Sequence, residues 1–423
     1  AQAFHMLGNK FWGNRMSAYS KSAAVEKVEN SAPVFRGPEA LLDAVRVVTD
    51  KIDKRVDEIE AGRAVPIDLH KEMAATGFFK MALHPMYGGA GYRLQDAVPI
   101  IEEIGRVDGS TAWSMMLGCE IHLAWTRFSP EFLTEIYAPE HPPMTRGALT
   151  PKGKMTKVDG GYVLNGRWPL ASGSYPTDWF IINSLVVDAE GRPICNPDGI
   201  IEPKMSAVPG SDVEVLDTWH AMGLRSTESH DITLSDYFVP DEHTAYGSAL
   251  QKDSGPLGQI TLTAALGTFH LGVVLGIARG MLDELAALSK ERKPIYTPTK
   301  FMAESPLFQK RYAEMELRLE AARAFVLSEA TRLWNQANAG DDITPQANVR
   351  HRAMVAHVHQ ECLWIANEVV SDSGTAVLYD GSSMQRRFRD MRSACQHVIA
   401  GTDIYQPHGA FMLGEDIESH IRI

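Results

Sequence analysis

Cysteine is scarce in this sequence, and its placement excludes the common metal and redox motifs. The cysteines are four in number, with no Cys-x-x-Cys pair and no Cys/His spacing typical of a metal site. We therefore expect no metal ligands, and a reduced protein of the cytoplasm. The four positions are Cys119, Cys195, Cys362 and Cys395.

Long apolar runs and an excess of basic charge are also missing. The longest apolar stretch, residues 270–278, ends at Arg279 and falls short of the ~20 residues that a membrane span needs. The N-terminus shows no apolar core of a secretory signal, and residues 1–6, which end in His-Met, are left out of the fold prediction. The net charge of −12 argues against nucleic-acid binding. We thus expect neither membrane nor nucleic acid as a partner.

Nucleotide-binding signatures are absent as well. The chain contains no Gly-x-Gly-x-x-Gly fingerprint between a strand and a helix, and no Walker loop. Any reducing equivalents from NAD(P)H are therefore expected to arrive through a separate protein.

The hydrophobic periodicity changes twice along the chain, which predicts an α+β multi-domain protein. Leu41, Val45, Val48 and Ile52 recur at helical spacing, whereas turn signals such as Gly160-Gly161 separate short β runs further on. A proline-rich stretch at 139–143 marks the first change. The expected parts are a polar arm at 1–37, an N-terminal helical domain at 38–143, a middle β-barrel domain at 144–245 and a C-terminal helical bundle domain at 246–423.

Several short motifs lie in a fixed order along these parts. A Pro-x-Tyr-Gly-Gly-x-Gly loop begins at Pro85, Asp-Gly-Ser begins at Asp108, and Gly-x-Arg-Ser-Thr begins at Gly223. Near the C-terminus Arg389-Asp390 is followed by Gly401-Thr402. Together these motifs resemble the acyl-CoA dehydrogenase superfamily over about residues 38 to 415. The resemblance implies an N-terminal helical domain, a middle β-barrel, a C-terminal four-helix bundle and a homotetramer.

Two positions favour the flavin-dependent monooxygenase branch of this superfamily. Typical dehydrogenases carry a catalytic glutamate four residues before the Arg-Asp pair, but here that residue is Gln385. An amide cannot abstract a proton, which argues against an acyl-CoA dehydrogenase or oxidase. His397 stands where the monooxygenase branch carries its catalytic histidine, and residues 166–173 match the branch's Gly-x-Trp-x-x-x-Ser-Gly signature.

The resemblance implies the oxygenase component of a two-component monooxygenase. Such an enzyme uses reduced FMN or FAD and O2, through a flavin hydroperoxide, to hydroxylate an aromatic, phenolic or polycyclic small molecule. A separate NAD(P)H:flavin reductase supplies the reduced flavin. S- or N-oxygenation on the same fold stays open as an alternative, and a non-catalytic scaffold is a further one.

The resemblance also assigns roles to individual residues. His397 is the expected base or proton relay, with His408 as a second candidate, and Ser172 is expected to stabilise the flavin peroxide. For Trp113, His122 and Phe269 core packing is the competing interpretation, because buried aromatic and histidine side chains are common in helices. The expected substrate-binding residues are Trp113, His122 and Phe269, and the expected cofactor-binding residues are Thr150, Ser172, Arg292, Gln309, Gly401 and Thr402.

Overall fold

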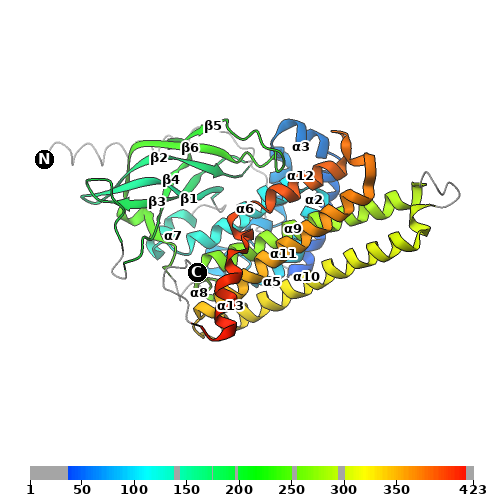
Figure 1. The fold of residues 1–423 in the computed structure, drawn as a ribbon. Coiled ribbons are helices and arrows are strands. Elements are labelled where there is room, and N and C mark those ends of the chain that lie inside the picture. The colour runs from blue at the N-terminus through cyan, green and yellow to red at the C-terminus, as the bar shows by residue number, and fades with distance from the viewer. Residues whose placement is uncertain are drawn as a thin grey trace. The chain divides into compact units, whose positions relative to one another are not determined.

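The structure is a computed structural model in which the sheet lies to one side of a body of helices (Figure 1), although along the chain it comes between two helical parts. Membrane-crossing helices are not found in the part of the chain that it describes, since none there is both long and apolar enough. The described residues are 37–137, 143–173, 175–195, 199–249, 255–293 and 301–415.

The first helical part forms because apolar residues repeat at helical spacing. In α2 the side chains of Leu41, Val45, Val48 and Ile52 are all buried, as the sequence predicts. α6 begins at Asp108, whose carboxylate accepts a hydrogen bond from the Thr111 amide at 2.8 Å. The elements are α2 (Pro38–Asp53), α3 (Val56–Gly62), α4 (Ile67–Ala75), η1 (Phe78–Lys80), η2 (Pro85–Tyr87), α5 (Leu94–Val107), α6 (Gly109–Trp125) and α7 (Pro130–Tyr137).

α6 is the element that joins the parts of the molecule. It packs against α5, against α9 of the second helical part and against β1 of the sheet. Almost every residue of α6 is buried, so it has no solvent-facing stripe. A helix that is apolar on all sides belongs in an interior, and α6 therefore presents side chains to several neighbours at once.

The middle part is a seven-stranded mixed sheet in the order β5-β6-β2-β1-β3-β4-β7. β1 and β3 run parallel, and the other neighbours are antiparallel. The predicted turn at Gly160 joins β1 to β2, with Val158 paired to Gly161. The strands are β1 (Thr145–Val158), β2 (Gly161–Ala171), β3 (Trp179–Val187), β4 (Lys204–Pro209), β5 (Glu214–Leu216), β6 (His230–Pro240) and β7 (Thr244–Tyr246), with η3 (Gly210–Asp212) and η4 (Asp241–His243) between them.

The middle domain predicted as a β-barrel is this mixed sheet, with β5 and β7 at its two edges. The two edge strands, β5 and β7, are three residues long, and in the recorded pairings each has a single neighbour. Such short strands offer too few backbone groups to pair with each other around a barrel. Short β runs and turn signals are shared by barrels and open sheets, so the sequence pattern could not distinguish them.

The second helical part contains the predicted four-helix bundle, made of α9, α10, α11 and α12. Glycines let α9 lie close to α5: a Cβ at Gly276 would stand 2.4 Å from the Glu102 carbonyl oxygen. The elements are α8 (Gly255–Gln259), α9 (Leu262–Glu291), η6 (Met302–Glu304), α10 (Pro306–Asn338), α11 (Pro345–Ser373), η7 (Gly374–Leu378), α12 (Ser383–Ala394), η8 (Val398–Ala400), η9 (Thr402–Ile404) and α13 (Tyr405–Leu413).

The hydrophobic core follows this arrangement. One large cluster of buried residues combines α2, α5 and α6 with the bundle helices, and a second cluster lies within the sheet. Both helical parts therefore share one interior, although the sheet separates them along the chain.

Candidate functional site

Four side chains from three distant segments meet where α6 crosses α9. The Trp113 ring lies 4.7 Å from the His270 ring and 5.7 Å from the His397 ring, measured between centroids. The His270 and His397 rings are 4.6 Å apart. The Glu120 carboxyl oxygen Oε1 lies 3.2 Å from His270 Nε2. We refer to these four residues, Trp113, Glu120, His270 and His397, as the imidazole cluster.

Helical spacing and a cap explain how the chain brings them together. Trp113 and Glu120 are seven residues apart on α6, which places them on one face two turns apart. His270 projects from α9 toward that face. His397 precedes η8 and caps it, because its Nδ1 accepts a hydrogen bond from the Ile399 amide at 3.3 Å.

Burial controls the charge state of the imidazole cluster. It raises the pKa of the Glu120 carboxyl well above its usual range and lowers the pKa of His270 to about 3. The pKa of His397 is also lowered, mainly by burial and then by the nearby His270 and His359. The imidazoles are therefore neutral near pH 7, a state in which histidine can move protons.

Several buried polar atoms around the imidazole cluster have no partner among the described residues. They are His270 Nδ1, Glu120 Oε2 and Nε2 of His359, the fully buried neighbour on α11 whose Nδ1 bonds the Val355 carbonyl at 2.8 Å. An unpaired buried polar atom is costly, so its presence calls for a specific explanation. A bound ligand would be such an explanation, because it could supply the missing hydrogen-bond partners.

Ser172 belongs to a chain of hydroxyl groups at the sheet. Its Oγ lies 2.6 Å from Ser229 Oγ, which lies 2.6 Å from Thr227 Oγ1. Ser172 also forms a β-bridge with Gly147, and a Cβ at Gly147 would stand 3.1 Å from the side chain of Ile121 on α6. Ile121 directly follows Glu120, so α6 carries two members of the imidazole cluster and also contacts Gly147, the β1 residue that bridges to Ser172.

Two predicted substrate-binding residues lie away from the imidazole cluster. His122 points to α7, where its Nδ1 lies 2.8 Å from the Tyr137 hydroxyl. Phe269 is fully buried in the core beside Met81 and Leu257. Successive residues on a helix point about 100° apart, so Phe269 cannot share the direction of His270.

The predicted cofactor-binding residues fall into two groups. Thr150 is exposed where the β1–β3 register shifts between Ala148 and Gly153, and Gly401 and Thr402 follow the turn that His397 caps. Arg292 and Gln309 lie at the other end of the bundle.

The separation of that second group follows from helix length. From His270 to Arg292 α9 runs about 33 Å, at ~1.5 Å per residue. Arg292 donates to the Asp372 carbonyl at 3.1 Å, and the exposed Gln309 donates to the Ala303 carbonyl at 2.9 Å. One chain does not bring these two residues to the imidazole cluster.

His408, the second candidate for the base, lies elsewhere too. It lines a groove of about 780 Å³ together with residues of α10, α11 and α13, among them Arg350 and Tyr405. The groove is separate from the imidazole cluster.

Sequence reasoning missed Glu120 of the imidazole cluster and His359, the buried neighbour of the cluster on α11. The helical spacing of Glu120 from Trp113 was available in the sequence, because positions seven apart share a face. For His359 no local signal existed, since its proximity to His270 depends on the packing of α9 against α11.

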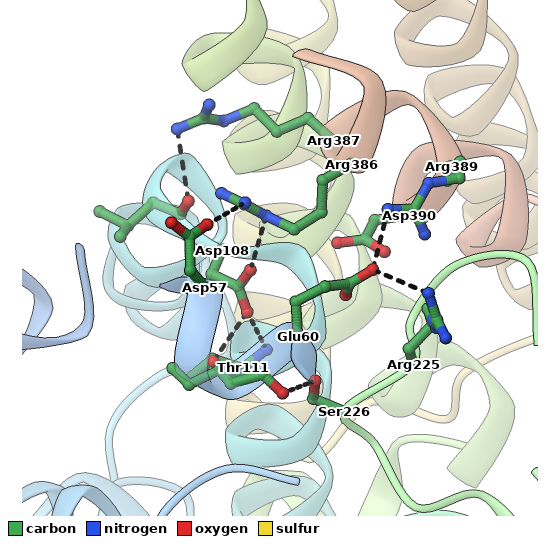
Figure 2. Close-up of polar contacts among 12 residues, drawn as sticks. Asp57, Glu60, Asp108, Thr111, Arg225, Ser226, Arg386, Arg387, Arg389 and Asp390 are labelled. Carbon is green, nitrogen blue, oxygen red and sulfur yellow. Dashed lines mark hydrogen bonds and ion pairs between the residues drawn. The ribbon is translucent and has the colours of Figure 1, made fainter. Parts of the chain in front are cut away.

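The Arg389-Asp390 motif forms a polar joint between three segments rather than part of the imidazole cluster (Figure 2). The buried Asp390 accepts a hydrogen bond from the Leu224 amide at 2.6 Å, and Arg389 donates to Glu60 at 2.8 Å. The Gly-x-Arg-Ser-Thr motif lies between β5 and β6 and also takes part in this joint. Its Ser226 hydroxyl donates a hydrogen bond to the Ile59 carbonyl of α3 at 2.6 Å. This joint ties α3, the 222–229 loop and α12 together.

Asp390 is also the most perturbed group of this joint. Burial, and next the nearby Asp108, raise its pKa to about 8. Arg386 lies between them, with its Nε 3.5 Å from Asp108 Oδ1.

Gln385 lies on α12 and is used structurally. Its Oε1 accepts a hydrogen bond from Arg389 Nε at 3.1 Å. The position that carries the proton-abstracting acid in dehydrogenases thus holds an amide engaged with its own helix.

Two family models match the chain and together cover more than half of it. The acyl-CoA dehydrogenase N-terminal domain matches residues 38–139, and the acyl-CoA dehydrogenase C-terminal domain matches residues 268–401. The chain belongs to the acyl-CoA dehydrogenase superfamily. The fold predicted from its sequence motifs is confirmed.

Within this superfamily the chain is similar to oxygenases. It is 29% identical to an indole-3-acetate monooxygenase of Pseudomonas putida, over 95% of this chain and 98% of that protein. It is 25% identical to the p-hydroxyphenylacetate 3-hydroxylase oxygenase component of Acinetobacter baumannii, over 86% of each. The structure of XiaF from Streptomyces with FADH2 and glycerol matches with a TM-score of 0.83 and 23% identity, covering 91% of this chain and 98% of that one.

The cofactor of these relatives fits the residues present here. A flavin requires hydrogen-bond partners for its ring and an apolar wall, and the region of α6 offers the Ser172 hydroxyl, the unpaired His270 Nδ1 and the Trp113 ring. Among the described residues no group of three or more metal-ligating side chains could hold a metal ion.

Proposed function

We propose that this chain is the oxygenase component of a two-component flavin-dependent monooxygenase that hydroxylates an aromatic small molecule. The overall reaction consumes reduced flavin, O2 and the substrate, and yields oxidised flavin, the hydroxylated product and water. The reduced flavin supplies the two electrons that split O2, one oxygen atom going to the substrate and the other to water.

One observation carries this proposal: a neutral imidazole cluster replaces the acid–base glutamate of the dehydrogenases. His397 lies against the Trp113 and His270 rings, while Gln385 bonds its own helix. A dehydrogenase needs a carboxylate to remove an α-proton, and an amide cannot do so. The oxygenases to which the chain is similar point to the same class of reaction.

The cap on η8 defines what His397 can do. Because Nδ1 accepts the Ile399 amide, a neutral ring carries its proton on Nε2 and presents a hydrogen-bond donor there. On this basis we assign His397 the role of a proton relay. A general base would instead need an Nε2 that carries no proton. Trp113 would wall the substrate, and the Ser172 hydroxyl would hydrogen-bond to the flavin side of the site.

The proposal includes the residues that hold the flavin. Ser172, Thr150 and the Gly401-Thr402 turn would hold it from the chain that carries the imidazole cluster. Arg292 and Gln309 lie too far along the bundle to reach the same flavin, so they would serve a site on another subunit.

A homotetramer is part of the same proposal. Large apolar side chains are exposed beside the bundle, including Val398, Met412 and Leu413, which are 81%, 74% and 82% exposed. Subunit contacts would cover such side chains. A mass in solution near four times 46.7 kDa is the expected result, and a monomeric mass would contradict it.

The remaining partners follow from the reaction. A separate NAD(P)H:flavin reductase would supply the reduced flavin, and the cytoplasm, where NAD(P)H is available, is the proposed compartment.

The test compares product with hydrogen peroxide released. Purified protein would receive reduced FMN or FAD from a flavin reductase, ¹⁸O2, and indole-3-acetate or p-hydroxyphenylacetate as probe substrates. We expect one ¹⁸O atom in the product. His397→Ala and Ser172→Ala should each lower the ratio of product to peroxide at least tenfold, because the reaction of reduced flavin with O2 would then give oxidised flavin and hydrogen peroxide instead of hydroxylated product.

Matched controls are exposed residues of the same types. His220→Ala and Ser211→Ala should leave the ratio unchanged, since both side chains lie on the surface. A ratio that is the same in all four variants would reject the roles assigned to His397 and Ser172. Absence of ¹⁸O-labelled product with every aromatic probe, together with reduction of bound flavin by an acyl-CoA, would reject the function itself.

A further inference from the structure

The pair formed by Glu120 and His270 lies deep inside the protein. Both side chains are about 97% buried, and Glu120 Oε1 is 3.2 Å from His270 Nε2. Neither residue belongs to the motifs that mark the superfamily in this sequence. The pair lies directly behind the Trp113 and His397 rings.

The surroundings favour a pair without charge. A buried ion pair must recover the cost of removing two charges from water through additional hydrogen bonds, but Glu120 Oε2 and His270 Nδ1 have no partner among the described residues. Burial raises the pKa of Glu120 and lowers that of His270, which acts in the same direction. The pair is therefore a carboxylic acid and a neutral imidazole.

The neighbouring titratable groups are neutral as well. Burial raises the pKa of the Cys119 and Tyr175 side chains and raises the pKa of Cys395 to about 12, while it lowers the pKa of His359 to about 4. These groups therefore add no charge near pH 7 that would ionise the pair.

A neutral pair determines the position of the proton on His270. A carboxylic O–H is a stronger donor than the N–H of a neutral imidazole, so the favoured arrangement has the Glu120 O–H donating to Nε2 and the ring proton on Nδ1. This Nδ1–H is a buried donor with no acceptor among the described residues. Such a donor is available to an acceptor atom of a molecule bound beside Trp113 and His397.

We propose that Glu120 is a positioning residue that acts through His270, holding this ring neutral with its proton on Nδ1 so that it can donate a hydrogen bond to a molecule bound at the imidazole cluster. This inference rests on the proposed function for the identity of that molecule, the aromatic substrate or the reduced flavin. The tautomer itself is a property of the protein alone.

The first experiment reads the tautomer directly, without catalysis. Protein containing ring-¹⁵N histidine would be studied by long-range ¹H–¹⁵N NMR at pH 7, with signals assigned through single histidine variants. We expect His270 to carry hydrogen on Nδ1 alone in the wild type. Glu120→Gln should preserve this state, because the amide N–H₂ also donates to Nε2. Glu120→Leu should give a mixture of the two tautomers.

The second experiment measures the ratio of product to peroxide in the same variants. Glu120→Gln should retain the wild-type ratio within about twofold, whereas Glu120→Leu should lower it at least fivefold. Glu102 provides the matched control. It is a buried glutamate of α5 that pairs with Arg323 at 3.0 Å, and Glu102→Leu and Glu102→Gln should both keep the wild-type ratio.

Two results would overturn this inference. One is a wild-type His270 that carries hydrogen on both nitrogens, which would mean an ion pair. The other is a Glu120→Gln variant that loses the Nδ1 tautomer or performs as poorly as Glu120→Leu. If Glu120→Leu does not fold, the tautomer of His270 in the wild type and in Glu120→Gln still tests the inference. If no variant makes product but the NMR result is as expected, the proposed function fails while the control of the tautomer stands.

Discussion

The sequence predicts that His122 binds substrate, but in the structure its side chain contacts a tyrosine of the neighbouring helix α7. Its Nδ1 lies 2.8 Å from the Tyr137 hydroxyl, and the Tyr137 ring stacks on Tyr87 at 5.0 Å between centroids. Burial lowers the pKa of His122 to about 4, so the ring is neutral and its Nδ1 can accept a hydrogen bond from the Tyr137 hydroxyl. The residue thus holds α6 to α7 rather than facing the imidazole cluster.

Tyr137→Phe tests this role. The change leaves His122 Nδ1 buried without a donor, which should cost about 1–3 kcal/mol in the free energy of unfolding. Urea denaturation at pH 7 measures the loss. The double variant with His122→Leu should lose less than the sum of the two single changes, because both remove the same bond. Strictly additive losses, or a changed ratio of product to peroxide in Tyr137→Phe, would contradict this assignment.

At the scale of elements, α12 is held by the polar joint around Asp390. The helix itself is predictable, since Ser382 caps its start with a hydrogen bond to the Gln385 amide. The packing of α12 depends on a residue far away in the sequence. A Cβ at Gly223 would stand 2.2 Å from the Arg389 carbonyl oxygen, so only glycine lets the 222–229 loop approach α12. The Leu224 amide then reaches Asp390.

Two variants, Asp390→Ala and Asp390→Asn, distinguish the role of Asp390 as a hydrogen-bond acceptor from the effect of a negative charge on its carboxyl group. Because burial and Asp108 raise the pKa of Asp390 to about 8, the carboxyl is mostly protonated at pH 7. Asn is then a close mimic that keeps an oxygen for the Leu224 amide, and should cost less than about 1 kcal/mol. Ala leaves that amide unpaired and should cost about 1–3 kcal/mol by urea denaturation. Equal losses in the two variants would indicate a charged Asp390 in the folded protein.

For the whole molecule, buried histidines set the response to acid. Burial lowers the pKa of His122, His351 and His359 to about 4 and that of His270 to about 3, against about 6.5 in an unfolded chain. Below pH 6.5 the unfolded chain binds more protons than the folded protein, so acid favours unfolding down to about pH 4. The raised pKa values of Glu120 and Asp390 act in the opposite direction, but these two carboxyls are outnumbered.

The free energy of unfolding should therefore fall between pH 7 and pH 5, by at most about 2 kcal/mol for each of these histidines. Urea denaturation at pH 7, 6 and 5 measures the slope. His351→Gln should reduce it, because one buried imidazole is removed, whereas His220→Ala, at an exposed position, should not. Stability that is constant or higher at pH 5 would contradict this prediction.

The sequence by itself determined the helical and β parts, the superfamily and its branch, because periodicity, turns and short motifs are local properties of the chain. It also predicted a site containing Trp113 and His397, whose ring centroids lie 5.7 Å apart in the structure. The tertiary structure decided what no local pattern contains: that the sheet stays open, that Asp390 bonds a distant loop, and that Glu120 and His270 stand behind His397. These outcomes depend on which faces of α6, α9 and α11 meet, and that is a matter of packing between residues far apart in the chain.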